Sequence, residues 1–95
     1  MISSLISQKR DAILQTTKKY GARNVRVFGS MARGEEREDS DVDLLVEFDP
    51  DRSLMDHAGL VIELEALLGR TVEIGTPKGL RESYRERILS EAVPI

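Results

Sequence analysis

Two aspartates, Asp41 and Asp43, stand two residues apart where an alternating apolar and polar stretch begins. Successive side chains of a β-strand point to opposite faces, so residues two apart share a face. Two carboxylates held together on a rigid strand repel each other, and a divalent cation relieves that repulsion, since carboxylate oxygens are ligands that Mg²⁺ accepts. The pair therefore indicates a metal site. A turn-forming acidic cluster, Asp39-Ser40-Asp41, running into an exposed strand edge remains the plain structural alternative.

A calcium loop is excluded by spacing. Asp39, Asp41 and Asp43 match the alternating start of an EF-hand loop, which requires glycine at its sixth position and glutamate at its twelfth. Those positions hold Leu44 and Pro50.

A second feature, the dipeptide Gly29-Ser30, ends a short apolar stretch shortly before the aspartates. Glycine allows a close approach of the backbone, and the amides that open a helix can donate to a phosphate. The same two residues often only cap a helix. Neither the P-loop pattern G-x-x-x-x-G-K-[ST] nor the dinucleotide pattern G-x-G-x-x-G is present in the sequence. Gly29-Ser30 therefore indicates phosphate binding only in combination with the aspartates.

The elements that must position these residues follow from hydrophobic periodicity and from capping residues. We expect helices over Ser3–Tyr20, Ser53–Leu68 and Lys78–Glu91, strands over Asn24–Gly29, Asp41–Phe48 and Thr71–Gly75, and one helical turn over Ser30–Arg33. The last helix should bury the stripe Leu80, Tyr84, Ile88 and Ala92, Tyr20 should lie in the core, and His57 should lie on the surface.

The order α-β-(short α)-β-α-β-α predicts an α/β (α+β) fold, a three-stranded mixed sheet with helices packed on one face and the other face available for a site. The short connection between Gly29 and Asp41 favours an antiparallel first pair of strands. The long helical crossover from Phe48 to Thr71 favours a parallel second pair.

Composition narrows the function classes. At 95 residues we expect a single domain, residues 1–95, with an aliphatic core, because only 4% of the residues are aromatic. A net charge of −3 argues against direct nucleic acid binding, which needs clustered Lys and Arg. Cysteine is absent, so thiolate metal sites are excluded. We expect no membrane association and a cytoplasmic location.

Taken together, Gly29-Ser30, Ala32-Arg33-Gly34, Ser40-Asp41 and Asp43-Leu44 resemble the signature of the DNA polymerase beta-like nucleotidyltransferase superfamily. More narrowly, the stretch GSMARGEEREDSDVDLLVEF resembles a minimal nucleotidyltransferase (MNT) domain, and the order of elements extends this resemblance over nearly the whole chain.

The resemblance implies roles for individual residues. Asp41 and Asp43 would bind Mg²⁺, the cofactor, which carries ATP. Gly29 and Ser30 would hold the terminal phosphates, and Arg33 would help to neutralise them.

A third carboxylate would complete the metal site and accept the proton of the attacking hydroxyl. The matching residue is Glu73, where the family more often has aspartate; it alternates away from Val72 and Ile74. An ordinary exposed glutamate on a domain that still binds nucleotide is the alternative for this position, because the longer side chain tests the strict geometry of Mg²⁺. The implied reaction transfers AMP to an acceptor and releases pyrophosphate.

The resemblance also implies a partner. Minimal nucleotidyltransferases of this type are similar to the antitoxin halves of two-gene modules whose toxin is a HEPN ribonuclease, and active members transfer AMP to a tyrosine of the toxin. The wide apolar arc of Ser53–Leu68 and the acidic balance both suit protein binding. Two other hypotheses stay open: neutralisation by steric binding with a weak or dead site, and transfer to a small molecule such as an aminoglycoside.

Overall fold

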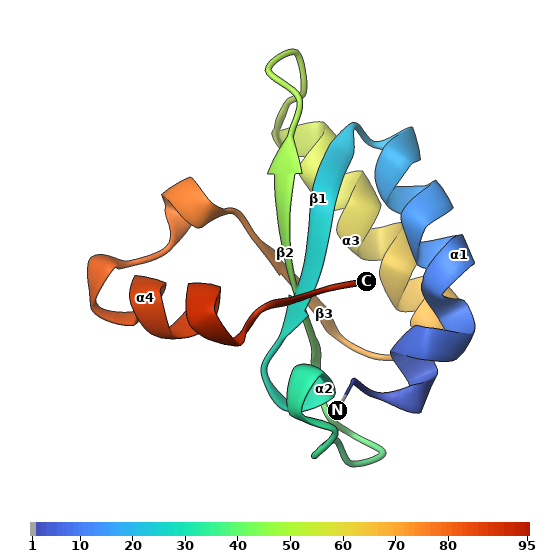
Figure 1. The fold of residues 1–95 in the computed structure, drawn as a ribbon. Helices are drawn as coiled ribbons and strands as arrows, with labels where there is room; N and C mark the ends of the chain where they lie inside the picture. Colours follow the sequence, from blue (N-terminus) through green and yellow to red (C-terminus); the bar gives the residue numbers. More distant parts are fainter. Residues whose placement is uncertain (1) are drawn as a thin grey trace.

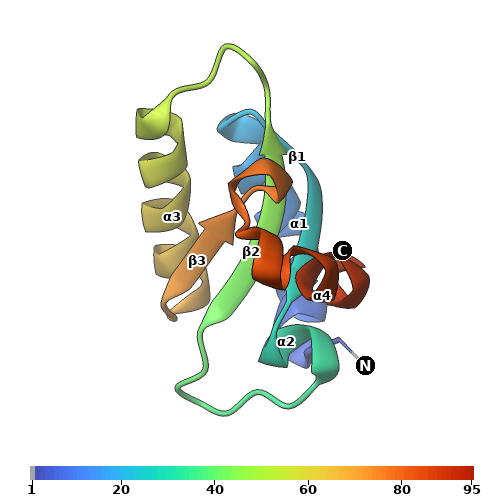
Figure 2. The ribbon, with the colours of Figure 1, turned by 90° about the vertical axis from the view of Figure 1, so that its left-hand side faces the viewer.

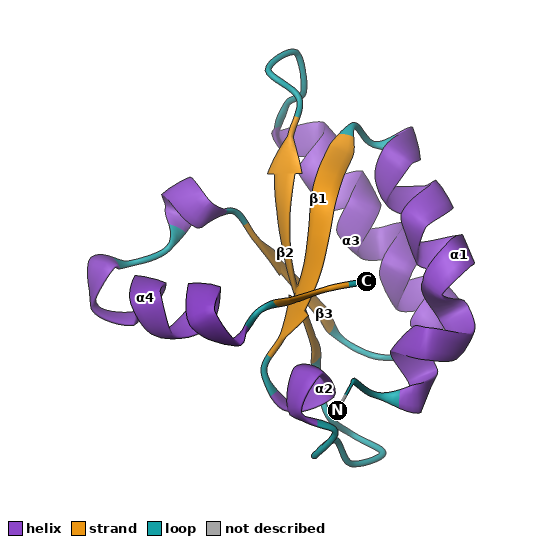
Figure 3. Ribbon diagram, viewed as in Figure 1, coloured by secondary structure: helices purple, strands orange, loops and turns teal. Residues whose placement is uncertain are grey.

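The computed structural model describes residues 2–95. Its helices and strands alternate along the chain (Figure 3). They are α1 (Ser4–Lys19), β1 (Ala22–Phe28), α2 (Ser30–Arg33), β2 (Val42–Phe48), α3 (Leu54–Leu68), β3 (Val72–Gly75), the 3₁₀ turn η1 (Pro77–Gly79), α4 (Glu82–Glu91) and β4 (Val93–Pro94).

One mixed sheet organises the fold, with its strands in the order β3-β2-β1-β4. β1 runs antiparallel to β2 and to β4, whereas β2 and β3 are parallel. Helices α1 and α3 cover one face of the sheet, and α4 lies on the opposite side (Figures 1 and 2). Both predicted strand pairings are therefore confirmed. The connection lengths explain them, because a short connection can reverse the chain whereas a crossover helix returns it to the same direction.

Local sequence signals fix the ends of the two long helices. The Ser3 hydroxyl accepts a hydrogen bond from the amide of Leu5 at the start of α1. At the start of α3, Ser53 and Asp56 form a reciprocal capping box, and Gly69 ends the helix in the left-handed conformation. Serine before a helix and glycine after it are the start and stop signals that capping rules describe.

The core lies between the sheet and the α1–α3 layer and is almost entirely aliphatic. Val42, Leu44 and Val46, which alternate along β2, are all fully buried there, and Phe48 packs against this core while partly buried. Leu45 points to the other face and is also fully buried. That second face is covered locally because the 3₁₀ turn η1 contacts β2.

The sheet differs from the prediction in two ways. It has a fourth strand, β4, whose two residues pair with Arg26 and Val27 of β1. The helices also do not all lie on one face, because α4 lies across the side that was expected to be open (Figure 1).

The predicted last helix is wrong in its start and in its burial. Thr76 caps a 3₁₀ turn at Pro77, as its hydroxyl accepts from the amide of Gly79, and an extended Leu80 and Arg81 separate this turn from α4. No residue of α4 is buried, and Tyr84 is 49% exposed rather than part of the core. An apolar stripe at helical spacing does not show whether the rest of the protein offers a surface for that stripe to pack on.

Two further side chains qualify the predictions. His57 is half-buried and stacks on the ring of Phe48, with 5.4 Å between ring centroids, rather than standing on the open surface. Tyr20 packs against the core as expected, although it remains partly exposed. Within residues 2–95, no helix combines the length and the apolar character needed to cross a bilayer.

Candidate functional site

The two strands at the centre of the site bring carboxylates from distant parts of the sequence together. Asp43 of β2 lies directly beside Glu73 of β3 in the parallel register, and beside Phe28 of β1 on its other side. Residues paired in this way lie on neighbouring strands about 4.8 Å apart and point to the same face. Asp43 is half-buried and Glu73 is exposed. Asp41 is exposed and lies just before the first residue of β2.

The electrostatics of Asp43 show how closely the acidic groups approach. Burial first, then the charge of Glu73 and a hydrogen bond with it, and then the charges of Asp41 and Glu91, raise the pKa of Asp43 from 3.8 to about 6. Burial and nearby negative charge both disfavour the ionised form of the Asp43 carboxyl. Asp43 is therefore the centre of a group of four carboxylates, and such a perturbed acid on a sheet face marks a functional site.

The turn at Gly29 adjoins Asp43 and has a backbone conformation that favours glycine. Gly29 has φ +73° and ψ −154°, a conformation that residues with a side chain rarely adopt. A Cβ atom at this position would lie 2.5 Å from Oδ2 of Asp43. Ser30 follows as the first residue of α2. The predicted phosphate-binding turn and the predicted metal ligand are thus in direct contact.

A carboxylate that the sequence did not predict occupies this turn. Oε1 of Glu91, at the end of α4, accepts hydrogen bonds from the Gly29 amide at 2.7 Å and from the Arg33 guanidinium at 2.6 Å. Arg33 also donates to Glu35 at 2.8 Å. The hydrogen bond to Glu35, followed by the charges of Glu91, Glu35 and Asp43, raises the pKa of Arg33 above its ordinary value despite some desolvation.

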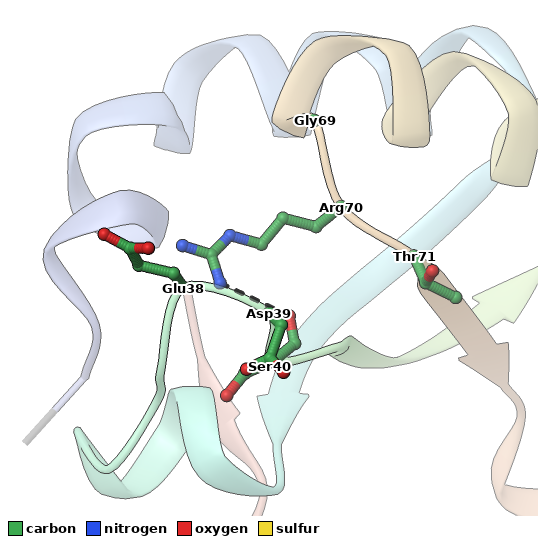
Figure 4. Close-up of a pocket in the computed structure, with 6 residues that line it drawn as sticks. All are labelled: Glu38, Asp39, Ser40, Gly69, Arg70 and Thr71. Carbon is green, nitrogen blue, oxygen red and sulfur yellow. Dashed lines mark hydrogen bonds between the residues drawn. The ribbon is translucent and has the colours of Figure 1, made fainter.

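The loop that leads into β2 is tied to the α3–β3 connection by Arg70. Its guanidinium donates to the carbonyl of Arg37 at 2.5 Å. It also donates to the carbonyl of Ser40 at 3.4 Å (Figure 4). Around it lies a polar pocket of about 200 Å³, lined by Glu38, Asp39, Ser40, Gly69, Arg70 and Thr71. This pocket lies beside the carboxylates and does not contain Asp43 or Glu73. Arg70 fixes the loop just before Asp41.

The chemistry of these donors fits a hard divalent cation, because Asp41, Asp43 and Glu73 offer only carboxylate oxygens. Their gathering is incomplete in the structure. Among residues 2–95, no three His, Cys, Asp or Glu side chains are arranged so that they could hold a metal ion as they stand. Asp43 and Glu73 are neighbours by strand register, whereas Asp41 comes from the exposed end of the loop.

Two residues of the site were missed from the sequence, Glu91 and Arg70. Both reach it through long-range contacts, Glu91 to a residue 62 positions earlier and Arg70 to carbonyls about 30 positions earlier. Neither belongs to a motif with the aspartates. Only the three-dimensional path of the chain could reveal them.

Comparison with known proteins agrees with this geometry. The family pattern of the nucleotidyltransferase domain matches residues 9–95. The chain belongs to this family. It is 38% identical to the protein adenylyltransferase MntA of Thermococcus cleftensis over 99% of this chain and 100% of the relative. The resemblance to the nucleotidyltransferases is thereby confirmed.

Two solved structures have the same fold, and the first of them also supports the family. A candidate minimal nucleotidyltransferase has 49% sequence identity and a TM-score of 0.87, with 100% of this chain and 97% of that one covered. A chain of a toxin-antitoxin complex crystallised with AMP-PNP has a TM-score of 0.75 at 15% identity, over 88% of this chain and 69% of that one. At this low identity the second structure supports the fold alone.

Proposed function

We propose that this chain, a single nucleotidyltransferase domain over residues 1–95, is a cytoplasmic antitoxin that neutralises a HEPN ribonuclease toxin. In this proposal it transfers AMP from ATP to a tyrosine of the toxin. The observation that carries the proposal is the contact between Asp43, Glu73 and the Gly29 turn, since it combines a carboxylate pair with a backbone amide at one point. The similarity to a protein adenylyltransferase supports AMP as the transferred group and protein as the acceptor.

The reaction is a displacement at the α-phosphorus of ATP. The tyrosine oxygen forms a bond to that phosphorus, the bond from the phosphorus to the oxygen bridging the α- and β-phosphates breaks, and pyrophosphate leaves. The Glu73 carboxylate accepts the proton of the tyrosine hydroxyl. Gly29 and Ser30 bind the terminal phosphates through their amides and hydroxyl, and Arg33 offsets their charge.

Asp41, Asp43 and Glu73 would hold the cofactor, Mg²⁺. When bound, it would neutralise charge on the phosphates and orient the leaving group. The raised pKa of Asp43 supports this assignment, because a carboxylate surrounded by other carboxylates gains most from a nearby cation.

The surface of α3 is the part of the chain that we assign to the toxin. Leu54, Met55 and Ile62 are 84%, 83% and 67% exposed. Ala58 and Ala66 continue the exposed stripe of Met55 and Ile62 along the helix. Large apolar side chains that stay exposed along one helix are typical of a protein interface. A protein of the same fold has been crystallised in a toxin-antitoxin complex, and we assign a toxin as the partner by analogy with it.

Labelled ATP tests the proposal. The chain is incubated with ATP labelled at the α-phosphate, Mg²⁺ and the HEPN protein, and label on the toxin is measured together with ribonuclease activity. We expect labelling and loss of ribonuclease activity. Asp43→Asn should abolish labelling, whereas Asp51→Asn, an exposed aspartate in the β2–α3 turn, should not. If the toxin is inhibited but carries no label, AMP transfer is refuted and neutralisation by steric binding takes its place.

A further inference from the structure

Glu91 occupies the groups that the proposed function assigns to the terminal phosphates. A single oxygen, Oε1, accepts from the Gly29 amide at 2.7 Å and from Arg33 at 2.6 Å. The Glu91 side chain is 24% exposed, so most of it is enclosed by the site. Its charge also reaches Asp43, whose pKa it helps to raise. An amide and a guanidinium that donate to one oxygen form an anion-binding site, and in the structure the Glu91 carboxylate is the bound anion.

A phosphate oxygen and Glu91 cannot use the Gly29 amide at the same time. The amide carries one hydrogen, which Glu91 accepts in the structure. If the phosphate entered beside Glu91 instead, two anions would meet at a point already near Asp43 and Glu73. The repulsion between two anions in contact is large where solvent access is limited. Binding of the triphosphate therefore requires that Glu91 withdraw.

The segment that carries Glu91 can withdraw at small cost. Helix α4 contains no buried residue. β4 pairs with β1 through only two residues, and the amide of Ile95 donates to Val25 at 3.3 Å. The carbonyl of Ile95 accepts from Arg10 at 3.4 Å, and the Ile95 side chain packs partly against the core. Segments with few buried apolar contacts open with low free energy.

We propose that Glu91 is an internal competitor of the nucleotide: it closes the anion subsite at Gly29 and Arg33, and binding of the triphosphate releases Glu91 and α4 from the sheet. This inference rests on the proposed function, because it takes that subsite as the place of the terminal phosphates. Two states follow. In the closed state Glu91 holds the subsite, and in the open state the phosphates hold it. The apparent affinity for ATP is then the intrinsic affinity of the open state multiplied by the fraction of molecules that are open.

Nucleotide binding to variants of Glu91 is the first test. The full chain is titrated calorimetrically with a non-hydrolysable ATP analogue and Mg²⁺, and separately with AMP. Glu91→Ala should tighten the analogue about tenfold, or about 1.4 kcal/mol. Affinity for AMP should be unchanged, because AMP lacks the terminal phosphates. Glu91→Gln keeps an acceptor without its charge and should give a smaller gain. Glu86→Ala is the matched control, because Glu86 is exposed on the same helix and its side chain forms no hydrogen bond or ion pair within residues 2–95.

Movement of α4 is the second test. Because the chain has no cysteine, Ser83→Cys on α4 and Ala66→Cys on α3 give one pair of spin labels. The label-to-label distance distribution should change when the ATP analogue and Mg²⁺ are added. When Glu91→Ala is added to the labelled variant, the distance distribution should change in the same way even without nucleotide. Circular dichroism checks that each variant is folded.

The outcomes separate this inference from the proposed function. Unchanged or weaker binding of the ATP analogue by Glu91→Ala would overturn the inference that Glu91 competes with the nucleotide. Weaker binding would show instead that Glu91 helps to hold the site in shape. Equal tightening of AMP would also overturn it, as would a fixed α4 at saturating nucleotide. In each of these cases AMP transfer to the toxin could still be observed, and the proposed function would stand. If the analogue binds to none of the variants, both proposals fail.

Discussion

Gly29→Ala is the substitution for which the structure gives the sharpest expectation. Gly29 has φ +73° and ψ −154°, and an added Cβ would lie 2.5 Å from Oδ2 of Asp43. Two costs therefore act together, backbone strain and a steric clash with a carboxylate that is predicted to bind metal. The chain supplies a control for the first cost alone. Gly69 also has a positive φ, +66°, but a Cβ there would meet nothing within 4 Å.

The expected magnitudes follow from these geometries. A left-handed conformation costs a residue with a side chain about 1–2 kcal/mol, which is the expected loss for Gly69→Ala. The extended positive-φ conformation of Gly29 costs about 1–3 kcal/mol. Overpacking adds about 1–3 kcal/mol in a rigid environment. Because the clashing atom is the end of a side chain, rotation of Asp43 relieves part of this, and we expect the clash to contribute about 1 kcal/mol after relaxation.

A double-mutant cycle measures the clash separately. Free energies of unfolding are determined by urea denaturation for the wild type, Gly29→Ala, Asp43→Ala and the double variant. Gly29→Ala should cost less by about 1 kcal/mol when Asp43 is already alanine, since the clashing carboxylate is then absent. The cost of Gly69→Ala should be the same with and without Asp43→Ala. Additive costs within about 0.5 kcal/mol for Gly29 and Asp43 would refute the contact as the reason for glycine.

Under the proposed function, the same substitution should affect activity more than stability. Rotation of Asp43 away from a Cβ at position 29 moves a metal ligand by about an ångström, which costs about 100-fold in rate. Gly69→Ala should leave AMP transfer within a few-fold of the wild type, provided that both proteins are assayed well below their unfolding temperatures. Equal loss of activity in the two variants would show that general destabilisation is responsible.

Three further outcomes are expected. Without metal, Asp43→Asn should be more stable than the wild type above pH 6, because the folded-state pKa of Asp43, about 6, exceeds its ordinary value of 3.8. Ionisation of Asp43 therefore destabilises the folded protein. This destabilisation is absent below pH 3.8 and grows as the pH rises toward 6. The upper bound of this stability difference is about 3 kcal/mol, which solvent screening reduces to about 1 kcal/mol. Urea denaturation at several pH values measures the difference. Exchange of Met55 and Ile62 for serine should weaken toxin binding at least tenfold in calorimetry while shifting stability by less than about 0.5 kcal/mol, since both are exposed. Ser53→Ala should cost about 1 kcal/mol in thermal unfolding, because it removes the capping box of α3; no loss would show that the cap is redundant.

The part of the fold between Ser4 and Gly75 was predictable because its signals are local. Capping residues mark α1 and α3, and alternation marks β2. Connection lengths then give the antiparallel and parallel pairings. The same alternation predicts that Asp43 and Glu73 share a face, and strand register places them side by side. Each of these inferences needs only a few neighbouring residues and the geometry of a sheet.

The segment after Gly75 was not predictable in the same way. Thr76 and Pro77 are a true helix-start signal, but the turn they open ends at Gly79 and a new helix begins at Glu82. Helical periodicity does not tell which face of a sheet receives a helix, so neither the exposure of Tyr84 nor the position of α4 follows from it. The contact of Glu91 with Gly29 depends on that position and could not be found before it was known.

The charges at the site constrain how a nucleotide can bind to it. Asp41, Glu73 and Glu91 all lie close enough to act on Asp43, whereas Arg33, the cation beside them, is shared between Glu91 and Glu35. Free ATP would add further negative charge to this group, and its terminal phosphates would have to displace Glu91 against the repulsion of the three remaining carboxylates. Asp41, Asp43 and Glu73 would hold a dication that came with the nucleotide, and its positive charge would offset the repulsion between these carboxylates and the phosphates. Under the proposed function, the substrate is therefore the magnesium complex of ATP, and the negative charge that costs the folded protein stability is what makes binding depend on the metal.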